Sequence, residues 1–158
     1  MRKLSIAILF SLCTVLATTD ARAIGFHISY WEADDFETGI GAGIKHKFGL
    51  VPPISIDVRA SYYRFNDSDL NLYPLEAAGR LKLGLFYGGL GVGYYIFTHK
   101  DVSASNSFGT FLIVGLEFAP MGLGAFAEAK WTFVDAEIGG VTGNADGYGI
   151  NLGMLFSW

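Results

Sequence analysis

Cysteine, long apolar runs and basic residues are all scarce in this sequence of 158 residues. The one cysteine, Cys13, lies near the amino terminus, so we expect neither a disulfide framework nor thiol chemistry in the rest of the chain. The longest apolar run, residues 4–17, is shorter than the roughly 20 residues that a membrane-spanning helix needs. The sequence therefore excludes a disulfide scaffold and a bundle of membrane-spanning helices.

The amino-terminal segment has the three parts of a secretory signal peptide. Arg2 and Lys3 precede the apolar run, and small residues follow it up to Ala23. We predict a cleavable signal peptide over residues 1–23 and one domain over residues 24–158, with a retained amphipathic anchor as the alternative. Cleavage would reduce the basic residues from 11 to 8 and the acidic residues from 15 to 14, a net charge of about −6. That balance argues against a nucleic-acid partner.

The remaining composition favours β-structure. The mean hydropathy of +0.37 is high, yet no segment is apolar enough for a membrane-spanning helix, so apolar residues must alternate with polar ones. The 21 glycines and the 15% of aromatic residues fit strands and tight turns better than helices.

The clearest alternation lies in residues 147–158. Its odd-numbered positions include several glycines and Asn151, whereas every even-numbered position is apolar. Such a stripe is typical of a strand that faces lipid and has an aromatic residue at the interface. The apolar face consists of Tyr148, Ile150, Leu152, Met154, Phe156 and Trp158.

The same alternation predicts eight strands in all. They cover residues 25–31, 39–48, 54–63, 75–83, 86–96, 111–118, 123–133 and 147–158. Long connections follow the first, third, fifth and seventh strands, including a loop over residues 134–146, and short connections follow the others. An even number of antiparallel strands with alternating long and short connections predicts an all-β, eight-stranded, up-and-down transmembrane β-barrel with both termini in the periplasm.

Alternation alone does not separate a membrane barrel from a soluble one with the opposite face outside. The aromatic residues of the apolar face favour the membrane barrel, because they gather near both ends of the strands, as interfacial girdles do. Near the short turns and near the long loops, respectively, these are Phe26, Phe48, Phe86, Phe118, Phe156 and Trp158, and Tyr30, Tyr62, Tyr94, Trp131, Phe133 and Tyr148.

The opposite face combines glycines with charges of both signs. Glycines would leave room for long neighbouring side chains in a narrow lumen, and buried charges must be paired. We therefore predict a lumen plugged by ion pairs among Lys45, Lys47, Asp57, Arg59, Glu76, Arg80, Lys82, Glu117, Glu128 and Lys130.

Three stretches carry a resemblance to a known family. They are residues 74–80 (PLEAAGR), residues 86–95 (FYGGLGVGYY) and the carboxyl-terminal strand that ends in Phe156-Ser157-Trp158. With them the chain resembles the small eight-stranded bacterial outer-membrane β-barrels that include OmpX, OmpW and the transmembrane domain of OmpA. The resemblance implies that the last strand is recognised by the outer-membrane assembly machinery, although this chain has Trp158 where phenylalanine is more usual.

Candidate chemistry is sparse. His27 and Ser29 share a face, but a catalytic triad needs a carboxylate that orients the histidine, so we interpret them as polar groups packed in the lumen. The glycine runs at 39–43 and 88–93 do not precede a helix, as a nucleotide-binding loop would. His46 is interpreted as interfacial. The acidic loop residues have no calcium-loop spacing: Asp34, Asp35, Glu37, Asp67, Asp69, Asp135, Glu137 and Asp146.

We therefore predict an outer-membrane protein with a structural or surface-interaction role, carried by four acidic extracellular loops. A narrow channel for small or hydrophobic solutes is the first alternative, and a lipid A-modifying enzyme is the second. We expect no catalytic residues, cofactor or metal. The expected partners are outer-membrane lipid, lipopolysaccharide and the assembly machinery, and the barrel is expected to be a monomer.

Overall fold

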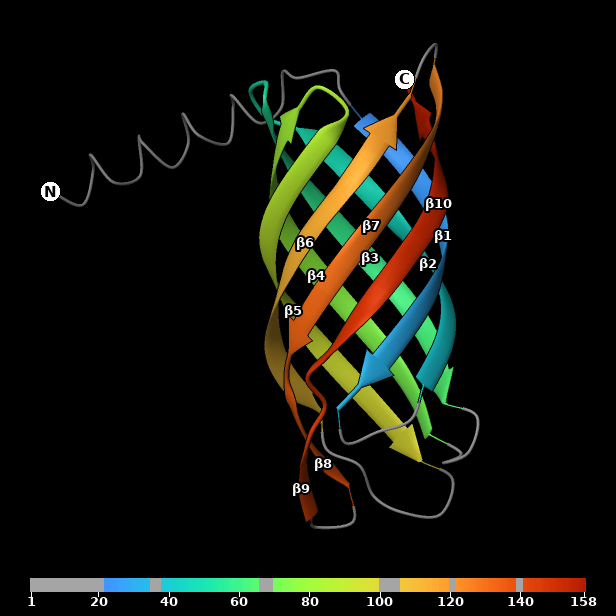
Figure 1. The fold of residues 1–158 in the computed structure, drawn as a ribbon, viewed down its shortest axis with the longest axis vertical. Helices are drawn as coiled ribbons and strands as arrows, with labels where there is room; N and C mark the ends of the chain where they lie inside the picture. Colours follow the sequence, from blue (N-terminus) through green and yellow to red (C-terminus); the bar gives the residue numbers. More distant parts are fainter. Residues whose placement is uncertain (1–21, 35–37, 66–69, 100–105, 120–121, 139–140) are drawn as a thin grey trace, which may run out of the picture.

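The computed structural model describes residues 22–34, 38–65, 70–99, 106–119, 122–138 and 141–158. They form the closed antiparallel barrel seen in Figure 1, with a small two-stranded hairpin beyond one of its ends. The strands are β1 (Arg22–Ala33), β2 (Thr38–Gly49), β3 (Ile54–Phe65), β4 (Leu70–Leu83), β5 (Phe86–His99), β6 (Ser107–Phe118), β7 (Leu123–Phe133), β8 (Asp135–Ile138), β9 (Val141–Asn144) and β10 (Gly147–Ser157).

Each strand of the barrel pairs with its neighbour in the chain, and β10 closes the ring against β1. In that closing ladder Phe26 lies opposite Met154 and Tyr30 lies opposite Ile150. The predicted eight-stranded up-and-down barrel is thus confirmed. The described residues contain no helix long and apolar enough to cross a membrane.

The predicted signal peptide falls mostly outside the described residues, because the description begins at Arg22. Arg22 and Ala23 form the first positions of β1, where Ala23 lies opposite Lys47 of β2 and Ser157 of β10. Cleavage after Ala23 would remove these two residues from the strand, and it stays a prediction.

Several strand boundaries differ from the prediction, because β3, β5 and β6 extend further towards the long loops than predicted. Strand β4 begins at Leu70, five residues before the predicted start, and it contains Pro74. The register between β3 and β4 runs from Ile54 to Ala60 and resumes at Tyr63, so the ladder is interrupted where Pro74, which has no N–H to donate, lies. The segment predicted as a loop over residues 134–146 contains the hairpin β8–β9, which projects from the barrel in Figure 1.

The two faces of the barrel wall have opposite chemistry. Along β1, exposed and buried residues alternate without exception, and the exposed set includes Phe26 (54% exposed) and Ile28 (66% exposed). Apolar side chains therefore cover the outer wall, while most charged side chains of the strands point inward. This is the reverse of the arrangement in a soluble protein, and it suits a strand that faces lipid.

Candidate functional site

The candidate site is the lumen, where the structure places all ten of the predicted charged side chains. They come from β2, β3, β4, β6 and β7, and they meet because every second residue of a strand points inward. Eight of them are buried, and Lys47 and Lys82 at one end keep some contact with solvent. Burying an unpaired ion costs several kcal/mol, so the arrangement needs close partners for each charge.

Arg59 and Glu128 form the centre of this network. The guanidinium of Arg59 on β3 donates from Nη1 and Nη2 to the two carboxylate oxygens of Glu128 on β7, over 2.5 and 3.2 Å. Asn151 and Tyr87 each donate a further hydrogen bond of 2.9 Å to the same carboxylate. A bidentate, charge-assisted pair of this kind fixes both side chains and joins opposite strands across the lumen.

Asp57 and Glu117 extend the network towards the end of the barrel that carries the short turns. Arg80 connects them, because its Nη1 donates to both oxygens of Asp57 and its Nη2 donates to Glu117 over 2.9 Å. Glu117 Oε1 also accepts hydrogen bonds from Lys47 over 2.6 Å and from Lys82 over 2.8 Å. One carboxylate at this end therefore contacts three cations.

Glu76 and Lys130 form the part of the network that lies towards the long loops. Lys130 Nζ donates to Glu76 Oε1 over 2.8 Å, and the hydroxyl of Tyr95 donates to the same oxygen over 2.9 Å. The ammonium of Lys130 also lies 5.3 Å from the ring centroid of Trp31 and 5.7 Å from that of Phe111. Aromatic rings therefore meet the charged network here.

Beyond this point the lumen is filled by an apolar cluster, which we call the apolar cap. Its ten buried residues lie where the strands approach the long loops: Trp31, Ala33, Tyr63, Phe65, Leu70, Leu72, Tyr95, Phe97, Val134 and Ala145. Asp146 accepts hydrogen bonds from the backbone N–H groups of Asp34 and Val134, which joins the ends of β1 and β7 above the cluster.

The sequence prediction did not include the apolar cap. Seven of its ten members lie outside the predicted strands: Ala33, Phe65, Leu70, Leu72, Phe97, Val134 and Ala145. Continuing the inward alternation of β3 from Tyr63 to Phe65, and of β5 from Tyr95 to Phe97, would have identified it, because both inward faces end in aromatic residues.

Inward-facing glycines make room for the large side chains. A Cβ atom on Gly93 would lie 2.7 Å from the ring of Tyr95, and one on Gly115 would lie 2.5 Å from the ring of Tyr87. These distances are shorter than any ordinary contact, so the rings occupy the space that a larger residue would take.

His27 and Ser29 each have a partner elsewhere in the lumen. His27 Nε2 lies 3.1 Å from Ser61 Oγ, and Ser29 Oγ donates to Asn151 over 2.7 Å. Both residues are thus packed in the lumen, in two separate hydrogen bonds with different strands, β3 and β10. His46, which is predicted to be interfacial, packs against Phe48 at a centroid distance of 4.2 Å.

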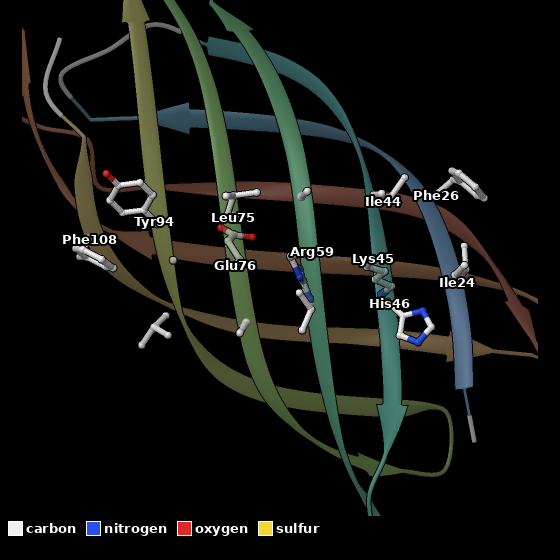
Figure 2. Close-up of a pocket in the computed structure, with 15 residues that line it drawn as sticks. Ile24, Phe26, Ile44, Lys45, His46, Arg59, Leu75, Glu76, Tyr94 and Phe108 are labelled. Carbon is white, nitrogen blue, oxygen red and sulfur yellow. The ribbon is translucent and has the colours of Figure 1, made fainter. Parts of the chain in front are cut away.

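The outer wall carries a hollow of about 690 Å³, which crosses β1 to β6. Figure 2 shows Ile24 and Phe26 at one end of it and Tyr94 and Phe108 at the other. Apart from His46, its outward-facing lining is mainly apolar, and the short side chains of Ala60 and Ala77 lie between larger neighbours. Its chemistry matches hydrocarbon chains rather than a polar substrate.

The predicted carboxyl-terminal stripe lies on the same outer wall. All six of its side chains are exposed: Tyr148, Ile150, Leu152, Met154, Phe156 and Trp158. Among the residues that the structure describes, no group of three or more His, Cys, Asp or Glu side chains is placed to hold a metal ion. Of the acidic loop residues, Asp35, Glu37, Asp67 and Asp69 lie outside that description.

The fold is similar to that of known membrane barrels. Neisserial surface protein A matches with a TM-score of 0.65 at 12% identity, over 87% of this chain and 96% of that chain. A de novo designed transmembrane β-barrel matches with a TM-score of 0.51 at 12% identity, over 89% of this chain and 98% of its own. No family model matches the sequence. No curated protein matches it either. The resemblance to small eight-stranded outer-membrane barrels is therefore confirmed for the fold.

Proposed function

We propose that this chain is an integral outer-membrane β-barrel with a closed lumen and a structural or surface-interaction role. The apolar outer wall supports the membrane location, because burying so many exposed apolar side chains in water-free surroundings is strongly favourable. The chemistry of that wall suits outer-membrane lipid and lipopolysaccharide as its surroundings. We propose no cofactor and no nucleic-acid partner, and we expect a monomer.

The single observation that carries the closed lumen is the link between Arg59 on β3 and Glu128 on β7, with the apolar cap beyond it. Ions would have to separate buried ion pairs and then cross an apolar layer to pass. We expect the purified protein to show no stable conductance on the nanosiemens scale in planar bilayers. A stable conductance of that size would contradict the closed lumen and favour a channel.

A matched pair of variants sharpens this experiment. Phe65→Ala opens space in the apolar cap but leaves the charged network intact, so this variant should show no conductance. Combining it with Arg59→Ser removes the central cross-link as well. If Phe65→Ala alone conducts, the cap rather than the network closes the lumen.

We also propose that the short turns face the periplasm and that the long loops and the hairpin β8–β9 face outward. Single cysteines at Asn106 and Leu85, in a Cys13→Ser background, lie towards opposite ends of the barrel. A membrane-impermeant maleimide should label Asn106→Cys on intact cells and should label Leu85→Cys only after lysis. The reverse pattern would invert the orientation.

We propose that the barrel is not an enzyme and that His27 serves packing. The hydrogen bond of His27 Nε2 to Ser61 lies inside the lumen, away from the lipid wall where a lipid A substrate would lie. Lipid A from cells that produce the protein should have an unchanged mass spectrum. A modified lipid A that disappears with His27→Ala would establish an enzyme instead.

The exposed stripe of β10 is proposed to be recognised by the outer-membrane assembly machinery, as the family resemblance implies. Phe156→Asp places a charge on this stripe without touching the lumen. We expect it to reduce assembled protein in the membrane far more than Ser157→Asp, and equal losses would argue against recognition of the stripe.

A further inference from the structure

The charges of the lumen do not cancel. Six basic and four acidic side chains meet in the network of the described residues, which leaves an excess of two positive charges. A net charge in a low-dielectric barrel raises the electrostatic potential around it, and it attracts an ion of the opposite sign wherever one can enter.

The excess is concentrated at the short-turn end. Deeper in the lumen, Arg59 pairs with Glu128 and Lys130 pairs with Glu76. At the short-turn end two carboxylates, Asp57 and Glu117, are shared by four cations: Lys45, Lys47, Arg80 and Lys82. The Glu117 side chain is 0% exposed, whereas those of Lys47 and Lys82 are 16% and 33% exposed. The carboxylate thus lies beneath the lysines, and the surface that solvent reaches is cationic.

This surface lines a hollow of about 510 Å³ beside the turn between β2 and β3. Lys47 and Lys82 contact the same oxygen of Glu117, so their ammonium groups lie next to each other. An ammonium has three N–H donors, and each lysine uses one of them on Glu117, which leaves donors for a ligand. The rest of the lining combines polar groups with an apolar wall: Ser55, Arg80, Leu50, Pro52, Pro53 and Ile54.

We propose that this hollow binds a phosphate group. A phosphate carries up to two negative charges and several acceptor oxygens, which matches the excess charge and the two adjacent ammonium groups. The hydroxyl of Ser55 adds a further donor. The phosphate can belong to a free anion or to a phospholipid headgroup. The site needs only the geometry of the short-turn end, so it goes beyond the proposed function and does not depend on it.

The test is a titration of the purified full chain folded in maltoside micelles, which contain no phosphate. Inorganic phosphate should cause saturable shifts in the amide resonances of Ser55, Lys82 and Gly84. Lys82→Met should weaken binding about ten-fold, as expected for the loss of one charge-assisted hydrogen bond. Lys82→Arg retains the charge and should bind phosphate nearly as well as the wild type. Lys47→Met provides a second, independent removal of a lysine.

Arg64→Gln is the control, because it removes an exposed cation at the opposite end of β3. It should leave binding unchanged, and circular dichroism checks that each variant is folded. A parallel titration adds phosphatidylglycerol or phosphate-free diacylglycerol to the micelles. Binding of inorganic phosphate supports a free anion, and binding of phosphatidylglycerol alone supports a lipid headgroup. Absence of saturable binding by both, or equal weakening by Lys82→Met and Arg64→Gln, would overturn the proposal.

Discussion

The two halves of the lumen are filled by opposite chemistry. Towards the short turns, ion pairs such as Arg59 with Glu128 cross from one side of the barrel to the other. Towards the long loops, the apolar cap contains ring contacts such as that of Trp31 with Tyr63, whose centroids lie 5.3 Å apart. The ion pairs demand exact partners, because an unpaired buried charge is costly, whereas an apolar cluster mainly demands the right volume.

The largest expected effect is in the charged half. Arg59→Met leaves Glu128 buried without its bidentate partner, and we expect a loss of about 3–5 kcal/mol in the free energy of unfolding. Urea unfolding in phospholipid vesicles measures it. The double variant Arg59→Met/Glu128→Gln should recover much of the loss, since it removes the unpaired charge. If Arg59→Met lowers the free energy of unfolding no more than the truncation of an apolar side chain in the cap, the two halves of the lumen do not differ in this way.

A smaller loss is expected in the apolar cap. Leu72 is fully buried, and Leu72→Ala should cost about 2–3 kcal/mol through lost contacts and a residual cavity. The same unfolding experiment measures it, with Leu72→Met as the control that keeps the volume and costs less. The loss should not depend on salt concentration. A strong salt dependence would mean that the cap and the network are not separate.

The next prediction concerns the inward-facing glycines and the large side chains packed against them. Gly115→Ala pushes a methyl group against the ring of Tyr87, whose hydroxyl donates to Glu128, and it should cost about 1–3 kcal/mol. Gly79→Ala is the matched control on the outer wall, where nothing lies within 4 Å of the added atom. Equal unfolding free energies for the two variants would show that the lumen is less tightly packed than the structure indicates.

The smallest effect is expected from Lys82→Met. About a third of the Lys82 side chain is exposed, and Glu117 keeps both Lys47 and Arg80, so the unfolding free energy should change by less than about 1 kcal/mol. Its folded yield and unfolding midpoint should match the wild type. If Lys82→Met lowered the free energy of unfolding as much as Arg59→Met, the charges at the short-turn end would also need strict pairing.

The barrel and the inward direction of its charges followed from the sequence, because the period-two alternation identifies the faces of each strand. The ion-pair partners of these charges did not follow from the sequence. Arg59 lies opposite Lys45 and Glu76 in its own ladders, yet its bidentate partner is Glu128 on β7. That choice depends on how the strands curve around the lumen, which no local pattern records.

The errors at strand ends also have physical causes. Pro74 interrupts the alternation of β4, so the prediction began after it and excluded Leu70 and Leu72. The strands β8 and β9 have four residues each, which is too short for alternation to be distinguished from a loop.

The span of the Arg59–Glu128 pair has a consequence for the time course of folding. The two residues are 69 positions apart, and the barrel closes only when β10 meets β1. Contacts between such distant residues form late, because a long loop must close before they can be made. A half-built barrel therefore holds inward charges without their counterparts. We expect this to make incomplete barrels short-lived and ring closure abrupt, so that few partly folded molecules accumulate along the way.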